Sequence, residues 1–207
     1  MIVKHNHFTT ASEMKAQLEE KNSELEVVFS DETTIQMFCN TLPEWSRDKK
    51  PVTLMVKHLL KVHVWGAISV KGKIGMHMFT ENLDHHLYHQ ILNENLYGNA
   101  SAMHGSRWVF QQDNDPKHTS RNVQGNLETH LPGQVLSWPS YSPDLNPIEN
   151  VWAILKKNVE KKIKSMVAQK KKISKEIFFN IIRKEWDDIE NIGIVNCINS
   201  MPSRIKA

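Results

Sequence analysis

Three acidic residues are placed where a folded chain could bring them together. Asp31 and Asp113 each follow a short run of β-branched and aromatic residues, and Glu149 lies in the opening turn of an amphipathic segment that begins at Pro147. We expect the two runs to be strands and the segment to be a helix. Two acids at strand ends can face one edge of a sheet where a helix supplies a third. Carboxylate oxygens at such an edge are the ligands that hard divalent cations prefer.

A cluster of three carboxylates would suit chemistry on phosphate esters. Cleavage of a phosphodiester needs an activated water or hydroxyl, and it needs charge to be neutralised on both the attacking and the leaving oxygen. Two divalent cations about 3.5–4 Å apart achieve this when carboxylates hold them. Because like charges repel, the cluster would be costly without a cation. A metal ion would then be part of the local electrostatics.

Each acid also has a local explanation that needs no metal. Asp31 is typical of a turn, and Asp113 can be a loop residue before a helix that Asp115 caps. Asn146 and Glu149 are spaced as the two halves of a capping box, with a proline between them at the first helical position. Local rules alone leave both interpretations open, and they favour Glu149 as a capping residue.

The expected strands lie mostly in the first two thirds of the chain. Residues 25–38 indicate a strand, a break at Asp31–Thr33 and a second short strand, with Asp31 at the end of the first. Glu32 should point to the opposite face of that strand, so we leave it out of the cluster. Further strands are expected at 61–68 and 73–79, which form a hairpin, and at 108–113 and 135–138.

Helices are expected between and after these strands. Apolar residues at helical spacing follow suitable start signals, such as an Asp cap or a Pro at the first helical position. Their order among the strands predicts a mixed sheet covered by helices. The expected helices follow Asp84, Asp115-Pro116 and Pro147, the last running to about Lys162, with one more at 177–189.

Positive charge is concentrated in one segment. The formal net charge is +3, yet residues 156–175 contain nine lysines and only one acid, Glu160, so the rest of the chain is net negative. A cationic segment beside an acidic body suits phosphate binding next to a metal centre. A solvated helix face is the alternative explanation for a lysine run.

The composition is that of a folded intracellular protein. Hydrophobic residues make up 40% and charged residues 24% of the 207 positions, which suits one domain or one domain with an appendage. No apolar run is long enough to cross a membrane, and the first residues lack a secretory signal. Cys39 and Cys197 favour reduced thiols over a disulfide. The histidines at 85, 86 and 89 lack the partner ligands of a zinc site and are expected on a helix surface.

Two long blocks resemble the signature blocks of the Tc/mariner superfamily of DDE transposases. They are WVFQQDNDPKHTS at 108–120 and WPSYSPDLNPIENVW at 138–152. FSDET at 29–33 resembles the family's first-aspartate block, VWGAIS at 64–69 its third-strand block, and NSMPSRIKA at 199–207 its closing helix. The resemblance covers about residues 25–207 in the family's order. It decides in favour of the metal-binding interpretation of the three acids.

For the fold, the resemblance implies an α/β, RNase H-like domain: a mixed five-stranded sheet flanked by helices, with a C-terminal helical extension. We expect an N-terminal tail or peripheral helix at 1–22, the catalytic domain at 23–165 and the extension at 166–207. The family reads its inverted repeats with N-terminal DNA-binding domains. Only 30 residues precede Asp31, so we expect those domains, and specific end recognition, to be missing.

For the function, the resemblance implies Mg²⁺-dependent cleavage at transposon ends and attack of the freed 3′-hydroxyl on target DNA, with Mn²⁺ able to substitute. The family's metal-binding acids correspond to Asp31, Asp113 and Glu149, with Asp31 bridging two ions and the others holding one each. His118 either approaches the phosphates or stabilises its turn. The residues expected to contact DNA are Lys117, His118, Lys156, Lys157, Lys161 and Lys162.

The partners implied are DNA, as transposon ends and as nonspecific target, and either a second copy of the chain or a full-length transposase. No membrane is expected, and a DNA substrate implies a nuclear location. Two alternatives remain beside the enzyme. One is a truncated or decayed copy that retains only salt-sensitive, lysine-driven nucleic-acid binding, and the other is a chain that pairs with full-length transposase through its core. The sequence alone leaves open whether the chain is an active enzyme.

Overall fold

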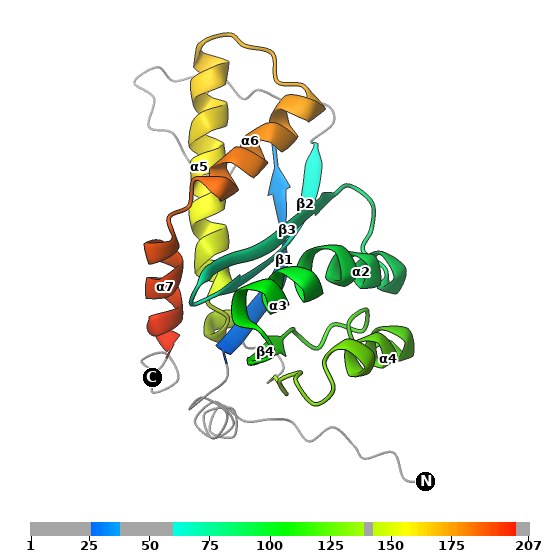
Figure 1. Cartoon of the computed structure of the whole chain (residues 1–207). Helices are drawn as coiled ribbons and strands as arrows, with labels where there is room; N and C mark the ends of the chain where they lie inside the picture. Colours follow the sequence, from blue (N-terminus) through cyan, green and yellow to red (C-terminus); the bar gives the residue numbers. More distant parts are fainter. Residues whose placement is uncertain (1–25, 38–59, 139–142, 202–207) are drawn as a thin grey trace.

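A four-stranded mixed sheet forms the centre of the molecule (Figure 1). The computed structural model describes residues 26–37, 60–138 and 143–201. In the strand order β3-β2-β1-β4, β2 is antiparallel to β1 and β3, which confirms the expected hairpin, and β4 is parallel to β1. The strands are β1 (Glu26–Gln36), β2 (Lys61–Ser69), β3 (Gly72–Phe79) and β4 (Trp108–Gln111).

β1 is one continuous strand, so the expected break at Asp31–Thr33 is wrong. Residues 29–36 pair with residues 68–61 of β2 in unbroken register, and Asp31 lies opposite Gly66. The expected place of Asp31 at a strand end is therefore also wrong, because it lies in the middle of β1. The hydrogen bonds of the β1–β2 ladder keep this polar stretch extended against its local turn tendency.

The expected fifth strand at 135–138 is reduced to a single parallel bridge between Val135 and Phe110, so the sheet has four strands rather than five in the described part of the chain. The backbone N–H of Phe110 donates to the carbonyl of Gln134, and its carbonyl accepts from the N–H of Leu136, both at 2.8 Å. The segment runs beside β4 without continuing as a strand. The proline at 139 has no N–H with which to extend such a ladder.

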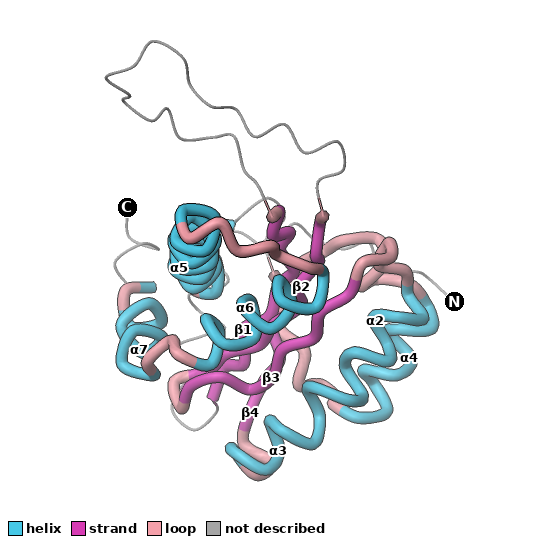
Figure 2. Tube along the Cα trace, turned by 90° about the horizontal axis from the view of Figure 1, so that it is seen from above, coloured by secondary structure: helices cyan, strands magenta, loops and turns pink. Residues whose placement is uncertain are grey.

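Three helices pack against one face of the sheet: α5 (Ile148–Ala168), α6 (Lys175–Asp187) and α7 (Asn191–Asn199). Figure 2 shows α5 and α7 on one side of the strands and α2 and α4 on the other. The helix α5 continues past residue 165, and the two helices after it share a core with β1 and β2. Members of this core include Phe29, Ile35, Val62, Val64, Trp152, Leu155, Phe178 and Trp186.

The other face is covered by α2 (His85–Leu92), α3 (Gly98–His104) and α4 (Arg121–His130). A π-helical stretch, η1 (Asn93–Tyr97), joins α2 directly to α3. Oδ1 of Asp84 accepts a hydrogen bond from the N–H of Leu87 at 2.8 Å, which confirms the expected N-cap. The second core, on this face, includes Val28, Trp65, Tyr88, Ile91, Trp108, Phe110 and Leu127.

The helix expected at Asp115-Pro116 begins five residues later than this signal suggests. Residues 116–119 form turns, and Oγ of Ser120 caps the helix by accepting from the N–H of Val123 at 3.4 Å. Oδ1 of Asp115 accepts instead from the N–H of Lys117 at 2.9 Å. Asp115 therefore closes a local turn, the other structure that a short acidic side chain favours.

The last expected helix, at 177–189, corresponds to α6, and α7 follows it as a further helix. The N-terminal segment expected at 1–22 lies outside the described residues. Among the helices described, none combines the length and the apolar character needed to cross a membrane.

Candidate active site

Strand pairing brings two of the predicted acids to the same level of the sheet. Phe29 of β1 and Gln111 of β4 form the last pair of a parallel ladder. Asp31 and Asp113 each stand two residues beyond that pair. Because parallel strands keep their register, Asp31, within β1, and Asp113, just beyond β4, lie at the same level next to the end of the β1–β4 ladder.

The start of α5 is tied to β1 at this level. Nδ2 of Asn146 donates to the carbonyl of Ser30 at 3.1 Å, and Nε1 of Trp152 donates to Oδ2 of Asp31 at 3.0 Å. The first turn of α5, which carries Glu149, is thus held against the strand that carries Asp31. Topology gathers the three predicted acids from strands and a helix far apart in sequence.

Asp31 lies in a crowded and negatively charged environment. Burial, followed by the charges of Glu32 and Glu149, raises the pKa of the Asp31 carboxyl from 3.8 to about 8. The hydrogen bond from Trp152 lowers this pKa but is outweighed. A cation bound beside Asp31 would offset the free-energy cost of ionising it.

Asp113 has the opposite electrostatic surroundings, because a histidine contacts it. Nδ1 of His118 donates to Oδ1 of Asp113 at 2.5 Å, and Nε2 lies 3.3 Å from Oε1 of Glu32. Burial opposes the shift, but the hydrogen bond and the charge of His118 hold the pKa of Asp113 below its usual value. Burial likewise lowers the pKa of His118, yet the contacts with Asp113 and Glu32 outweigh it and raise that pKa to about 10. The ring is therefore cationic at neutral pH.

The carboxylate of Glu149 does not form the reciprocal bond of a capping box. Oδ1 of Asn146 accepts from the N–H of Ile148 at 3.3 Å, but the residue directly before the first helical residue of α5 is Pro147, so Asn146 lies one residue before the N-cap position rather than at it as expected. Glu149 is exposed, and within the described residues its carboxylate makes no hydrogen bond. The bond back to the N–H of Asn146 that a capping box needs is therefore missing. Helix capping alone leaves the acidic group of Glu149 unexplained.

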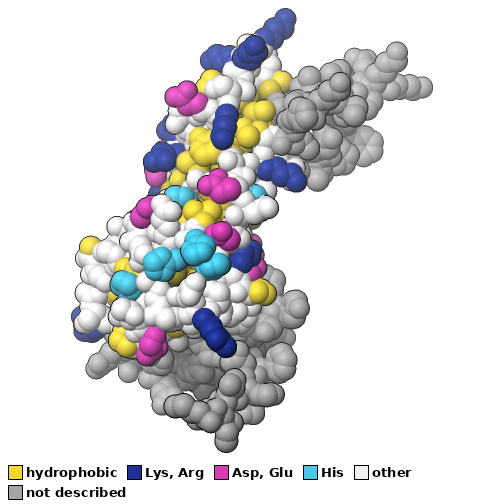
Figure 3. Space-filling model, turned by 90° about the vertical axis from the view of Figure 1, so that its right-hand side faces the viewer, with side chains coloured by type: hydrophobic (Ala, Val, Ile, Leu, Met, Phe, Trp, Pro, Cys, Tyr) yellow, Lys and Arg dark blue, Asp and Glu magenta, His cyan; other side chains and the backbone are white. Residues whose placement is uncertain are grey.

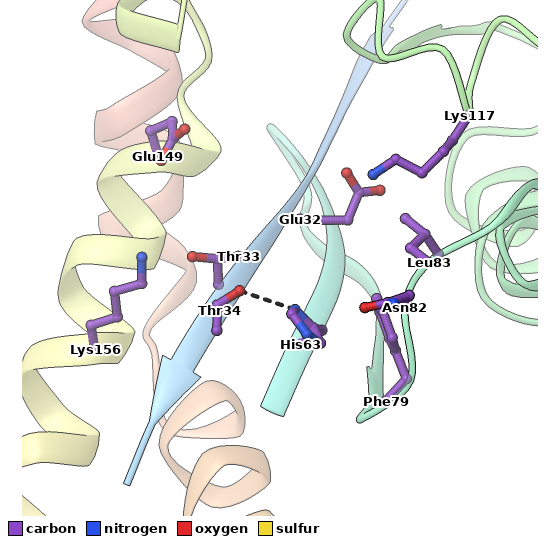
Figure 4. Close-up of a pocket in the computed structure, with 10 residues that line it drawn as sticks. All are labelled: Glu32, Thr33, Thr34, His63, Phe79, Asn82, Leu83, Lys117, Glu149 and Lys156. Carbon is purple, nitrogen blue, oxygen red and sulfur yellow. Dashed lines mark hydrogen bonds between the residues drawn. The ribbon is translucent and has the colours of Figure 1, made fainter. Parts of the chain in front are cut away.

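A cleft of about 550 Å³ opens beside the start of α5 (Figure 4). Glu149 and Lys156 line it from α5, while Glu32 and Lys117 line the opposite side. Acids that attract cations and lysines that attract phosphates therefore face one space. Asp31 and Asp113 are not part of the lining. The other lining residues are Thr33, Thr34, His63, Phe79, Asn82 and Leu83.

Exposed lysines extend from this cleft along α5. Lys156, Lys157, Lys161 and Lys162 are all exposed on this helix. In Figure 3, Lys and Arg side chains gather toward the upper end of the molecule, where Figure 1 places the junction of α5 and α6. His118 differs from these residues because it is 2% exposed with both ring nitrogens turned to carboxylates. This geometry suits a role in stabilising the turn and offers no exposed edge to a DNA phosphate.

The predicted acids are of the type that binds a divalent cation, although their side chains do not converge on one position. Within the described ranges, no three His, Cys, Asp or Glu side chains stand close enough to hold one ion. The charge of Glu149 raises the pKa of Asp31, so bringing both groups, ionised, around one point costs free energy without a cation. Both hydrogen bonds to Asp113 end on Oδ1, and the side chain is 51% exposed, so Oδ2 can face an ion. Oxygen ligands with one buried, uncompensated acid suit Mg²⁺ or Mn²⁺.

The family model for DDE superfamily endonucleases matches residues 26–174. The chain belongs to this family. The match includes β1, β4 and the start of α5, and with them all three predicted acids.

The sequence relatives are transposases of the Tc1 type. The chain is 34% identical over 190 residues to the Tcb1 transposase of Caenorhabditis briggsae, with 87% of this chain and 66% of that protein covered. It is 32% identical over 189 residues to the Tc1 transposase of Caenorhabditis elegans, with the same two shares covered. The chain thus spans just under two thirds of the length of these relatives.

Solved structures show the same fold. A paired-end complex of Mos1 transposase with the left transposon end has a TM-score of 0.72 and 19% identity, covering 100% of this chain and 63% of that chain. The catalytic domain of Mos1 mariner transposase has a TM-score of 0.65 and 20% identity, covering 100% of this chain and 93% of that domain. These likenesses confirm the expected RNase H-like fold. With the family match, they confirm the resemblance to Tc/mariner catalytic domains.

Sequence patterns miss two residues of the site. Glu32 is excluded by strand alternation, which correctly places it on the face opposite Asp31 but says nothing of His118 on that face. Trp152 is one of the apolar residues at helical spacing after Pro147 and has no predicted role in the site, yet its indole N–H donates to Asp31. A buried Trp usually finds a partner for its N–H, and this rule is the one signal that points to the bond.

Proposed function

We propose that this chain is the catalytic domain of a cut-and-paste DNA transposase, which cleaves phosphodiesters at transposon ends and joins the freed 3′-hydroxyl to target DNA. The family match supports endonuclease chemistry, and the Tc1-type relatives support DNA as the substrate. The single observation that carries the proposal is the convergence of Asp31, Asp113 and the first turn of α5 at the β1–β4 junction.

We propose that Asp31, Asp113 and Glu149 bind the metal ions. Bound divalent ions would supply charge neutralisation at the attacking and leaving oxygens of the phosphate. Solved Mos1 complexes that contain Mn and Mg support Mg²⁺ as the cofactor, with Mn²⁺ as a substitute. The raised pKa of Asp31 supports the same assignment, because a buried carboxylate without a counterion favours cation binding.

The lysines of the cleft and of α5 are the proposed DNA contacts. Lys117 and Lys156 line the cleft on opposite sides and would bind phosphates next to the acids. Lys157, Lys161 and Lys162 extend this charge along α5 and would bind the strand beyond the cleft. Such contacts are independent of sequence, so we propose nonspecific DNA binding. Action on chromosomal DNA would place the protein in the nucleus, either paired with a second copy or with a full-length transposase.

A cleavage assay tests the proposal. The purified chain is incubated with supercoiled plasmid and MgCl₂, MnCl₂ or EDTA, and nicked product is measured. We expect nicking with either metal and none with EDTA. The variants Asp31→Asn, Asp113→Asn and Glu149→Gln should each lose at least about 1,000-fold in rate, as expected when a group holding a catalytic metal is removed.

The matched control is Glu128→Gln, a change of an exposed acid on α4, which should nick at the wild-type rate. Nicking at the wild-type rate by all three acid variants, as well as by the control, would show that another group, or a contaminating nuclease, is responsible. Salt-sensitive DNA binding without any metal-dependent nicking would support a chain that retains only nucleic-acid binding.

A further inference from the structure

The face of β1 opposite Asp31 carries a buried contact that the proposed metal site does not use. Glu32 points from β1 toward His118, which lies in the turns after β4. Oε1 of Glu32 is 3.3 Å from Nε2 of His118, and the other ring nitrogen donates to Asp113. One imidazole therefore joins a carboxylate of β1 to a carboxylate just beyond β4.

The His118 ring is held from several directions. It stacks on Tyr88 of α2 with 4.0 Å between ring centroids, and the Tyr88 hydroxyl donates to Oε1 of Gln112 at 2.8 Å. The backbone N–H of His118 donates to the carbonyl of Asp115 at 2.9 Å, and the His118 carbonyl accepts from Nε2 of Gln124 at 2.9 Å. These contacts fix the backbone and the ring plane. The direction in which each ring nitrogen points is therefore set before any ligand arrives.

The position of Glu32 indicates that its carboxylate interacts with the His118 ring. Oε1 of Glu32 is buried and accepts no hydrogen bond from the described residues, so the close approach of the imidazole is what compensates its charge. A buried carboxylate without such compensation is costly. On its other edge, the His118 ring donates to Oδ1 of Asp113. The Asp113 side chain is half-exposed, so its second oxygen, Oδ2, is left for other contacts.

We propose that Glu32 is a positioning residue, which acts through His118 to hold the Asp113 carboxylate in the orientation that binds a metal ion. This inference rests on the proposed function, because it assumes that Asp113 binds metal. The arrangement follows the logic of metal sites in which outer carboxylates orient the groups that touch the ion. Glu32 itself would not contact the metal.

The test is Mn²⁺ binding to the full-length chain, measured by calorimetry without DNA. Loss of an outer partner typically weakens metal binding about 10–100-fold. We expect that loss in Glu32→Ala, and less than about tenfold in Glu32→Gln, because the side-chain oxygen of Gln keeps an acceptor facing Nε2 of His118. Glu128→Gln is the control and should bind as the wild type does.

Two further readouts separate positioning from a general structural effect. In ¹⁵N-histidine-labelled chain without metal, the ring N–H signals of His118 should be protected from exchange in the wild type and in Glu32→Gln, and the Nε2–H signal should be lost in Glu32→Ala. Plasmid nicking by Glu32→Ala should return to within about threefold of the wild-type rate at saturating Mn²⁺, as for a residue that affects metal binding alone.

The outcomes distinguish the inference from the proposed function. If the wild type binds Mn²⁺ and Glu32→Ala binds it equally well, the positioning role is wrong while the proposed function stands. If nicking by Glu32→Ala stays abolished at saturating metal, Glu32 acts directly and the inference is also wrong. If the wild type binds no Mn²⁺, both fail. Should Glu32→Ala not fold, the same comparison is made with Glu32→Leu, which places an apolar side chain there and removes both carboxylate oxygens. Wild-type Mn²⁺ affinity in Glu32→Leu would overturn the positioning role.

Discussion

Asp31 and Glu32 are neighbours in β1, yet their side chains meet opposite surroundings. On the α5 side, Asp31 accepts a hydrogen bond from the neutral indole of Trp152, while burial and the charges of Glu32 and Glu149 disfavour its ionised form. On the α2 side, Glu32 and Asp113 share the cationic ring of His118. One face of the strand has negative charge in excess, and the other has its charges paired.

This difference indicates how the site can be built from the two faces of one sheet. The paired charges on the α2 side are complete without metal, so Asp113 has a fixed partner in the free chain. On the α5 side, the negative charge around Asp31 would be neutralised only by a bound cation. We infer that metal binding changes the α5 side more than the α2 side.

The largest expected effect comes from replacing the titratable carboxyl group of Asp31 by an amide. Its pKa is raised from 3.8 to about 8, so between these pH values the folded chain binds a proton that the unfolded chain has released. The free energy of unfolding of the metal-free chain therefore falls as the pH rises through this range. Asp31→Asn removes the effect and should stabilise the metal-free chain by about 2–4 kcal/mol at pH 7. Urea unfolding in EDTA at several pH values measures this.

His118 provides an internal control for the same experiment. Its pKa is raised from 6.5 to about 10, so its stabilising contribution is complete below pH 6.5 and is lost as the pH rises to about 10. The decline above pH 8 should therefore persist in Asp31→Asn. If the free energy of unfolding changes equally with pH in the wild type and in Asp31→Asn between pH 4 and pH 8, Asp31 does not have a raised pKa in the folded chain.

A somewhat smaller effect is expected at Gly66, which lies opposite Asp31. A Cβ atom there would stand 2.5 Å from Cη2 of Trp152 and 3.2 Å from Cη2 of Trp186, both of which are buried. Gly66→Ala should destabilise the chain by about 2–3 kcal/mol and move Trp152 away from Asp31. Urea unfolding and the indole N–H signal of Trp152 in NMR measure the two effects.

Gly98→Ala is the matched control, because a Cβ at this helical position meets no atom within 4 Å. We expect it to be neutral or to stabilise the chain by about 0.5–1 kcal/mol. Equal stability of Gly66→Ala and Gly98→Ala would mean that the indole does not lie against the sheet as described.

The smallest effect per residue is expected from the exposed lysines of α5. Combining Lys157→Ala, Lys161→Ala and Lys162→Ala should reduce the slope of log affinity against log salt by about 3, or about 1 for each lysine that no longer binds a phosphate. DNA-binding titrations at several salt concentrations measure the slope. Lys184→Ala on α6, where the lysine is paired with Asp188, should leave the slope unchanged. An unchanged slope in the triple variant would assign the DNA path to another surface.

The sequence predicts much of the fold because its strong patterns are local. The 61–68 and 73–79 hairpin, the Asp84 cap and the last amphipathic helix each follow from residues close in sequence. The break at Asp31–Thr33 fails because pairing with β2, about 30 residues away, decides the conformation of β1. The strand at 135–138 fails because its edge gains only the two backbone hydrogen bonds around Phe110.

The candidate site shows the same limit. The motifs place Asp31, Asp113 and Glu149 at positions that the β1–β4 register and the start of α5 bring near one another. Glu32 and Trp152 depend instead on contacts between segments 86 and 121 residues apart, to His118 and Asp31 respectively. No local pattern encodes such a contact, so only the folded chain reveals it.

Metal binding by the free chain tests the central claim most directly. Mn²⁺ titrations followed by electron paramagnetic resonance compare the wild type with Asp31→Asn, Asp113→Asn and Glu149→Gln, with Glu128→Gln as control. We predict that the wild type and the control bind Mn²⁺ and that each of the three variants loses at least about tenfold in affinity. Wild-type affinity in the three variants would contradict the assignment of these acids as the metal ligands.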